Sequence, residues 1–284
     1  MIRRSVLATV SAVRIARVAT HLVRGLSMAS TRFARLTPAA QHRELEQWSH
    51  ELLSILRVRL SCHNAPESLP ARCLVVLNHV SWLDVFGIFA VLPCQFVAKS
   101  EVRDWPLVGR LTERVGTLFI ERGNRRHAQR TNGRIVEALM NARLIAVCPE
   151  GATTDGRALK HFHAALLQPA IDADAMVLPV AVRYLDHSGA QTDAAAYVDG
   201  VSLLQSLWRI ARSPLTVELR FAAPIEAHGL KRRELADAAK RVIAHELGLP
   251  APDKEPETPG GLLAVPPTAR RPTHSPYPVP VDPA

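Results

Sequence analysis

Short apolar runs alternate with helical patterns through most of this chain. Runs typical of buried strands occupy residues 73–77, 95–98, 118–121, 144–148 and 176–182, and residues 215–221 alternate as a further strand. Helical patterns are predicted at residues 82–92, 125–141, 158–171, 201–211 and 231–247. Strands that alternate with helices in this way predict an α/β fold, with a single central mixed sheet covered by helices.

The N-terminus has a different pattern, that of a basic amphipathic helix over residues 12–26. Its polar face and its apolar face fall on opposite sides of a helical wheel: Arg14, Arg17, His21 and Arg24 against Ile15, Val18, Ala19, Leu22 and Leu26. Such a helix suits an anionic membrane surface, where arginines meet headgroups and apolar side chains sink among acyl chains. A mitochondrial-type presequence and a helix that packs on the protein body are the alternatives. The arginines argue against a signal peptide, because they interrupt its apolar core.

A second helix is predicted over residues 39–60, with Pro38 at its start. Its apolar stripe indicates contact with a core or a membrane: Leu45, Trp48, Leu52, Leu53 and Leu56. We therefore expect residues 1–60 to form an N-terminal membrane-docking region and residues 61–249 to form the α/β domain. Residues 250–284 contain eleven of the 21 prolines, which predicts a disordered Pro-rich tail.

Composition narrows the class of protein. The chain has 284 residues, 48% of them hydrophobic and 21% charged, which excludes global disorder and a fibrous repeat. The four cysteines show no paired spacing, so we expect no disulfide framework and a reducing, cytosolic environment. No run of 18 apolar residues without a charge is present, which argues against a conventional spanning helix.

The net charge of +9 is concentrated at the N-terminus. Residues 1–37 contain seven arginines and no acidic residue, residues 250–284 carry −1, and the remaining 212 residues therefore hold only +3. Codon bias explains part of the preference for arginine over lysine, but it does not explain the missing acids. With only 5% aromatic residues and a nearly balanced body, we expect no nucleic-acid partner.

The first candidate for chemistry is His79 with Asp84, directly after the strand at residues 73–77. Ligands of α/β proteins bind at the ends of strands. If His79 precedes the first helical turn, the carboxylate reaches back to its ring, fixes the tautomer and leaves the other nitrogen as a general base. The alternative is a histidine satisfied by the local backbone and an aspartate that serves the helix N-terminus.

Two further segments place polar residues at strand ends. Gly116 begins the segment that leads to Arg122, whose guanidinium suits the capture of phosphate, although a surface salt bridge is the alternative. Glu150 and Gly151 follow the strand at residues 144–148, and an ordinary loop is the alternative there. We expect Glu150 to orient Arg122 or to bond an acceptor hydroxyl. Lys99 adds a cation near another strand end.

Two other sites carry less weight. His161 and His163 have the spacing of zinc ligands, but no cysteine or second histidine pair stands at ligand spacing, so we expect no metal. Cys148 follows an apolar strand with no histidine at a recognisable spacing. We therefore interpret this thiol as a buried spectator and not as a nucleophile.

Taken in order, these segments resemble the four sequence blocks of the glycerolipid acyltransferase family, which includes the bacterial 1-acyl-glycerol-3-phosphate acyltransferases. The blocks are His79 with Asp84, then residues 116–122, then residues 149–151, then residues 178–182. The resemblance covers about residues 48–247. The third block departs from the commonest pattern, because an aromatic is usual where Cys148 stands and a hydroxyl residue where Ala152 stands.

The resemblance implies that His79 is the catalytic base and that Asp84 orients it. It also places Arg122, Glu150 and Gly151 at the acceptor site. Gly116, from the second block, and Lys99, near its strand end, join the expected substrate-binding residues, and Pro179 belongs to a block of less settled role.

By that resemblance the protein transfers an acyl group from acyl-CoA or acyl carrier protein to a lysolipid hydroxyl, and the favoured acceptor is 1-acyl-glycerol-3-phosphate, which gives phosphatidic acid. It needs no cofactor and no covalent acyl-enzyme, because donor and acceptor can react directly once held together. We expect it at the cytoplasmic face of an inner membrane. The alternatives are another lysolipid acceptor, such as a lyso-ornithine lipid, and a non-catalytic protein that binds the membrane surface.

Overall fold

The structure, a computed structural model, describes residues 2–121 and 125–250. Arg122 and the Pro-rich tail therefore lie outside the described residues, apart from Pro250. The strands are β1 Val58–His63, β2 Cys73–Leu77, β3 Cys94–Lys99, β4 Leu118–Ile120, β5 Leu144–Val147, β6 Met176–Leu185, β7 Leu215–Phe221 and β8 Ile225–Glu226. The α-helices are α1 Ile2–Thr31, α2 Pro38–Leu56, α3 Leu83–Phe89, α4 Val108–Arg114, α5 Arg125–Met140, α6 Gln168–Asp172, α7 Leu203–Arg212 and α8 Arg232–Leu247, and short 3-10 turns cover Phe33–Arg35, Ser100–Asp104 and Ala164–Leu166.

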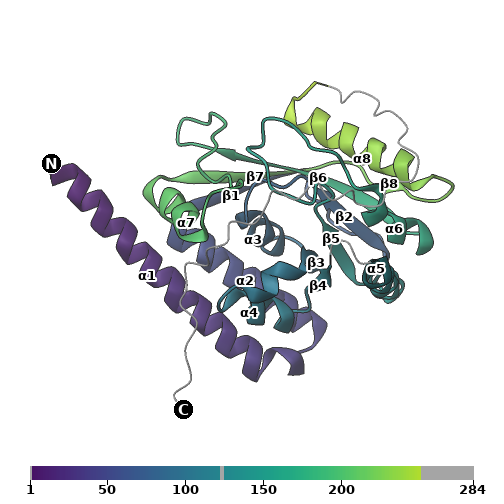
Figure 1. Ribbon diagram of the computed structural model, residues 1–284, viewed down its shortest axis with the longest axis horizontal. Coiled ribbons are helices and arrows are strands. Elements are labelled where there is room, and N and C mark those ends of the chain that lie inside the picture. Colours follow the sequence, from purple (N-terminus) through teal and green to yellow (C-terminus); the bar gives the residue numbers. More distant parts are fainter. Residues whose placement is uncertain (1, 122–124, 251–284) are drawn as a thin grey trace, which may run out of the picture.

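The strands form one mixed sheet with the order β1-β7-β6-β2-β5-β3-β4, and β8 pairs with β6 (Figure 1). Strands β6, β2, β5, β3 and β4 run parallel to one another, whereas β7 is antiparallel to β6. The fully buried pattern of β2 suits a strand with helices on both sides. The predicted α/β fold with a single central mixed sheet is confirmed.

Each face of the sheet carries its own hydrophobic core, because successive side chains of a strand point to opposite faces. In β2, Val75 and Leu77 pack with α2, α3 and α7, whereas Leu74 and Val76 pack with α5 and α8. The helices therefore cover both faces of the sheet (Figure 1). All but one of the predicted strands are found within one residue of the expected ends, and β6 runs on to Leu185.

Two helix predictions are wrong in part. The second helix ends at Leu56, where Arg57 takes a left-handed φ of 57°, and residues 58–60 belong to β1, which pairs with β7. The apolar spacing of that helix happens to continue into the strand. The helix predicted at residues 158–171 is mostly absent, because helical turns there begin only at Ala164.

Helix α1 packs against the protein body, through α2, α4 and α7. Val18 is buried, and Arg14 donates to the carbonyl of Ala211 in α7. His21 was expected on the polar face, but it is only 2% exposed and stacks on Trp48 of α2 at 5.0 Å between ring centroids. Its imidazole contacts the backbone of Trp48, which explains how a buried polar ring is tolerated.

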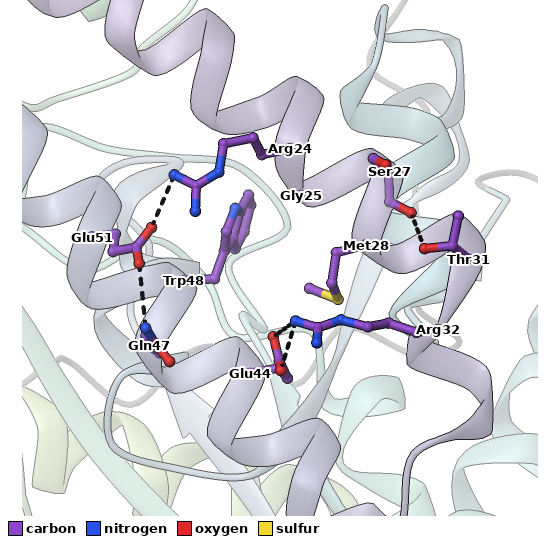
Figure 2. A pocket seen from close by; sticks show the side chains of 10 residues that line it. All are labelled: Arg24, Gly25, Ser27, Met28, Thr31, Arg32, Glu44, Gln47, Trp48 and Glu51. Atoms are coloured by element: carbon purple, nitrogen blue, oxygen red, sulfur yellow. Dashed lines mark hydrogen bonds and ion pairs between the residues drawn. The ribbon is translucent and has the colours of Figure 1, made fainter.

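A hollow of about 420 Å³ lies between α1 and α2 (Figure 2). Arg24 pairs with Glu51 at 3.7 Å, and Arg32 pairs with both carboxylate oxygens of Glu44 at 2.8 Å. Both arginine side chains are well exposed, so these pairs stabilise the helical hairpin weakly. Among the described residues, no helix is both long enough and apolar enough to cross a membrane.

Candidate active site

The carboxyl ends of the parallel strands meet at one edge of the sheet, and the predicted site residues gather there. His79 follows β2, Glu150 follows β5, and Lys99 is the last residue of β3. Since β2, β5 and β3 are neighbours in the sheet, these three positions lie side by side at its edge. This is the edge at which open α/β sheets bind ligands.

His79 and Asp84 form a direct pair. The Nδ1 atom of His79 lies 2.8 Å from Oδ2 of Asp84. Helix α3 begins at Leu83, so His79 precedes its first turn and Asp84 lies within it, which is the condition under which the carboxylate reaches back to the ring. Because the carboxylate only accepts hydrogen bonds, Nδ1 carries the proton, and the other ring nitrogen is left as a base.

Asp84 is fully buried, and hydrogen bonds stabilise its charge. Its Oδ2 also accepts from the backbone N–H groups of Val80 and Ser81, at 2.8 and 2.9 Å. Its Oδ1 accepts from the hydroxyl of Tyr184 in β6, at 2.7 Å. Burial and the nearby Asp84 charge raise the pKa of Tyr184 well above its ordinary value, so this hydroxyl stays a donor.

Glu150 ties the loop after β5 to the loop after β2. Its Oε1 accepts from the backbone N–H of His79 at 2.7 Å, and its Oε2 accepts from that of Lys160 at 2.9 Å. The N–H of Thr154 donates in turn to the carbonyl of His79 at 2.8 Å. Burial raises the pKa of Glu150 above its ordinary value, although its hydrogen bonds oppose the shift. The geometry thus gives Glu150 a positioning contact with His79, which the sequence did not suggest.

Asn78 anchors the same loop from the other side. Its side-chain amide donates to the carbonyl of Val182 at 2.9 Å and accepts from the N–H of Val182 at 2.7 Å. Asn78 and Tyr184 were missed by the sequence analysis. The only signal was the inward-facing alternation of the strand that carries Val182 and Tyr184, which continues three residues beyond its predicted end.

The pKa of His79 depends in part on Cys148, which we had interpreted as a spectator. Burial lowers the pKa of the imidazole, but the Cys148 thiol and the Asp84 carboxylate raise it, and the pKa lies well above its ordinary value. Cys148 thus lies close enough to the ring to act on its charge, and it is half-buried. The interpretation of this thiol as a spectator rested on the lack of a histidine at a recognisable spacing, and the fold supplies one that is 69 positions away in the sequence.

Not every predicted residue reaches this edge. Gly151 follows Glu150 with a φ of 65° and lies in the same loop. Gly116, with a φ of 84°, precedes β4 beside Gln95 at the opposite ends of these strands. Pro179 is buried inside β6, opposite Val76 of β2. Its neighbours Leu178 and Val180 point into the core on the His79 side, so Pro179 faces the other way.

A hollow of about 470 Å³ borders the loop that Glu150 holds. Its lining includes both signs of charge, from Asp155, Lys160 and Asp199, together with Thr153 and Thr154. The rings of His161 and His163 are 5.2 Å apart, edge to face. Within residues 2–121 and 125–250, no cluster of three or more histidine, cysteine or acidic side chains could hold a metal ion.

Comparisons with known proteins agree with this geometry. The family model described as acyltransferase matches residues 59–183. The 1-acyl-sn-glycerol-3-phosphate acyltransferase of Neisseria meningitidis is 38% identical over 215 residues, which cover 74% of this chain and 84% of that protein. The lyso-ornithine lipid O-acyltransferase of Pseudomonas aeruginosa is 39% identical over 171 residues, 60% of this chain and 66% of that protein.

The crystal structure of the 1-acyl-sn-glycerophosphate acyltransferase of Thermotoga maritima has a similar fold, with a TM-score of 0.66 at 18% identity. The similarity covers 87% of this chain and 96% of that one. Three observations support the same family: the fold, the histidine–aspartate pair, and the similarity over most of a relative's length. The chain is an acyltransferase of the lysolipid type and belongs to the glycerolipid acyltransferase family.

Proposed function

We propose that the enzyme transfers an acyl group from acyl-CoA or acyl carrier protein to the hydroxyl of 1-acyl-glycerol-3-phosphate, giving phosphatidic acid. The observation that carries the proposal is the 2.8 Å contact between His79 Nδ1 and Asp84 Oδ2, at the ligand-binding edge of the sheet. The relative from Neisseria meningitidis, named for this reaction, supports the choice of acceptor.

In the proposed reaction, His79 removes the proton from the lysolipid hydroxyl as its oxygen attacks the carbonyl carbon of an acyl thioester. Asp84, buried and negatively charged, stabilises the imidazolium that forms, and the thiol leaves with a proton. Glu150 holds the backbone of His79 in place through its hydrogen bond. Arg122, Gly151 and Lys99 remain the proposed contacts to the acceptor.

A lyso-ornithine lipid is the second candidate acceptor. The relative from Pseudomonas aeruginosa is named for that substrate, and the hollow beside Thr154 carries the carboxylates of Asp155 and Asp199. Two carboxylates beside the single ammonium group of Lys160 favour a headgroup that carries an ammonium of its own and disfavour a phosphate, so this lining suits an amino-acid headgroup. A panel of lysolipids with a labelled acyl donor distinguishes the two, because only one of them should be acylated efficiently.

The base is tested by His79→Ala in the same assay, with His161→Ala as the matched control. His161 is exposed in a nearby loop. We expect His79→Ala to lose roughly 10²- to 10⁴-fold in kcat and the control to keep it. Because the base must be neutral and the pKa of His79 is raised, the wild-type rate should increase with pH beyond the ordinary histidine value of 6.5. Full transfer by His79→Ala would overturn the assignment.

We further propose that α1 rests on the cytoplasmic face of an inner membrane. Its exposed side chains include Val10, Val13 and Val23 as well as Arg17, a combination that suits the boundary between headgroups and acyl chains. Sedimentation with anionic and zwitterionic vesicles tests this surface. We expect stronger binding to the anionic vesicles, weakened by salt and by Arg17→Glu, and equal binding to both would contradict the proposal.

A further inference from the structure

The helices leave part of one face of the sheet open. Helix α8 packs on β6 (Figure 1), and the hydrophobic core beneath it includes Val177 and Ala181 of that strand. Among the described residues, no side chain of β1 or β7 belongs to this core. These two outer strands therefore turn one side toward solvent, as sheets with antiparallel strands often do.

The side chains on this open side are mostly cationic. The alternation of each strand puts five titratable side chains there, because the residues beside them pack into the core on the other face. We call this set the cationic face, and it consists of Arg59 and His63 of β1, Arg183 of β6, and Glu218 and Arg220 of β7. Its three arginines and one glutamate leave a net charge of +2 when the histidine is neutral.

Glu218 organises the centre of the cationic face. Its side chain is only 8% exposed, and its Oε1 accepts from Nε of Arg183 at 2.8 Å and from Nε of Arg220 at 2.6 Å. Its Oε2 lies 3.4 Å from Nε2 of His63. Burial raises the pKa of Glu218, but the hydrogen bonds from the two arginines outweigh burial, and the pKa lies below its ordinary value. The carboxylate therefore stays charged and holds both guanidinium groups in place.

The outer ends of these guanidinium groups are left for a partner. Arg183 and Arg220 bond through Nε, and within residues 2–121 and 125–250 their terminal NH₂ groups make no hydrogen bond. Their side chains are 25% and 31% exposed. Arg59 is exposed and makes no ion pair with a described residue. A guanidinium group that is already ordered suits a carboxylate, because it donates in a fixed fork and loses little further freedom on binding.

The cationic face lies directly behind the catalytic loop. Arg183 stands between Val182, which bonds the side chain of Asn78, and Tyr184, which bonds Asp84. Because β6 runs parallel to β2, the end of β6 lies at the same edge of the sheet as His79. A partner on the cationic face is therefore one sheet thickness from the catalytic pair, and an arm that passes over this edge can reach it.

The shape of the surface favours a protein partner over a small anion. Small ligands bind in concave sites, and neither of the two hollows described above is lined by a residue of the cationic face. A charged sheet face instead fits a partner with a complementary charged surface. Of the two candidate donors, only acyl carrier protein is of this kind, a small acidic protein that carries its acyl thioester on a long flexible arm.

We propose that the cationic face is the docking surface for an acidic acyl carrier protein, whose arm passes over the edge of the sheet and presents the thioester to His79. This inference rests on the proposed function and deepens it, because it selects the carrier protein over acyl-CoA as the donor.

The first test compares two donors in the acyl-transfer assay. Arg59→Glu reverses an exposed charge of the cationic face, and Arg220→Gln removes one ordered guanidinium group. With palmitoyl acyl carrier protein as donor, we expect either substitution to raise KM by roughly tenfold at low salt, at the lower end of the effect of electrostatic steering on association. With palmitoyl-CoA we expect wild-type kcat and KM, which also shows that the variants fold.

The matched control is Arg134→Glu. Arg134 is exposed on α5, which contacts β4 and β5 at the other end of the sheet, so its reversal changes the net charge equally without touching the cationic face. We expect it to keep the wild-type KM for both donors. An equal rise in KM for Arg59→Glu with palmitoyl-CoA and with the carrier protein, or no rise with either, would overturn the inference.

The second test measures docking without chemistry. A fluorescently labelled acyl carrier protein that bears its arm but no acyl group is titrated with the full chain, and binding is followed by anisotropy. We expect binding that weakens with salt and with Arg59→Glu, but not with Arg134→Glu, because the contact depends on local opposite charges. Binding that is indifferent to Arg59→Glu would overturn the docking surface.

The outcomes separate this inference from the proposed function. If wild type acylates 1-acyl-glycerol-3-phosphate from palmitoyl-CoA but neither binds nor uses the carrier protein, the proposed function stands and the docking surface falls. If the carrier protein binds in a manner that depends on Arg59 but no lysolipid in the panel is acylated, the acceptor assignment falls and the docking surface stands.

Discussion

The charged side chains around His79 and the arginine–glutamate pairs between α1 and α2 lie in opposite environments. At the loops, the polar groups are buried, and Asp84 alone accepts four hydrogen bonds at 2.7 to 2.9 Å. In the hairpin, the charged pairs lie at the surface, where the Arg32 side chain is 60% exposed (Figure 2). Loss of a polar contact lowers the free energy of unfolding strongly at a buried site and weakly at an exposed one.

This difference matches the proposed roles of the two regions. A general base must be held within a fraction of an ångström, and His79 has hydrogen bonds to Asp84 in α3 and to Glu150 in the loop after β5 that can hold it. A helix that lies on a membrane meets a soft and variable surface, and it needs no such precision.

Asp84→Asn should have the largest effect on kcat. Its carboxamide offers one acceptor oxygen, while the NH₂ group would face donors that now bond a carboxylate. We expect a loss of roughly 10²- to 10⁴-fold in kcat and of about 1–3 kcal/mol in the free energy of unfolding. Acyl-transfer assays and urea denaturation measure the two. Asp172→Asn, in the exposed end of α6, should leave both unchanged, and a fully active Asp84→Asn would contradict the role of the carboxylate.

Tyr184→Phe removes a single donor from the same carboxylate. Oδ1 of Asp84 would lose its 2.7 Å bond, while the three donors to Oδ2 remain. We expect a loss of about 1.5–3 kcal/mol in the free energy of unfolding, with a smaller effect on kcat than Asp84→Asn. The matched control is Tyr197→Phe, whose ring packs edge-on against Trp105. Equal stability of the two variants would show that the buried bond contributes little.

The sequence predicted the parts of the site that are local. His79 and Asp84 are only five positions apart. The patterns of β2 and α3 place His79 after the end of the strand and Asp84 at the start of the helix. Tyr184 lies in β6 and Cys148 follows β5, and only the pairing of these strands with β2 brings Tyr184 to Asp84 and Cys148 to His79. No local spacing encodes that pairing, so these two contacts could not be predicted from the residues themselves.

Local patterns also explain which strands were predicted correctly and which were not. Both ends of strand β7 were predicted correctly, because its side chains alternate between core and surface over Leu215–Phe221. Strand β1 was absorbed into the preceding helix, since Val58 and Leu60 continue the apolar spacing of Leu52 and Leu56. What ends the helix is the left-handed backbone of Arg57, a conformation that arginine rarely adopts and that no turn residue signals here.

Gly25→Ala tests a close approach between α1 and α2. A Cβ at residue 25 would lie 2.6 Å from Nε1 of Trp48, so α1 must shift or the indole must turn. Overpacking costs about 1–3 kcal/mol, against a helix-propensity gain of about 1 kcal/mol. We expect a net loss in thermal stability and no change in kcat for a short-chain, water-soluble acceptor. Gly133→Ala in α5, where nothing lies within 4 Å of the new Cβ, should stabilise the protein, and the same gain at residue 25 would contradict the packing argument.

Arg32→Gln should have the smallest effect, because it removes a charge pair at the surface. Arg32 donates to both oxygens of Glu44 at 2.8 Å, but its exposure leaves the pair worth about 0.2–1 kcal/mol. We expect urea denaturation to show a loss in this range at low salt that shrinks at 1 M salt, where the screening length falls to about 3 Å. Arg17→Gln, also exposed on α1, controls for the change in net charge. A loss that exceeds that of Tyr184→Phe, or that survives high salt, would mean that the hairpin is held as the active site is, and the contrast between the two regions would fail.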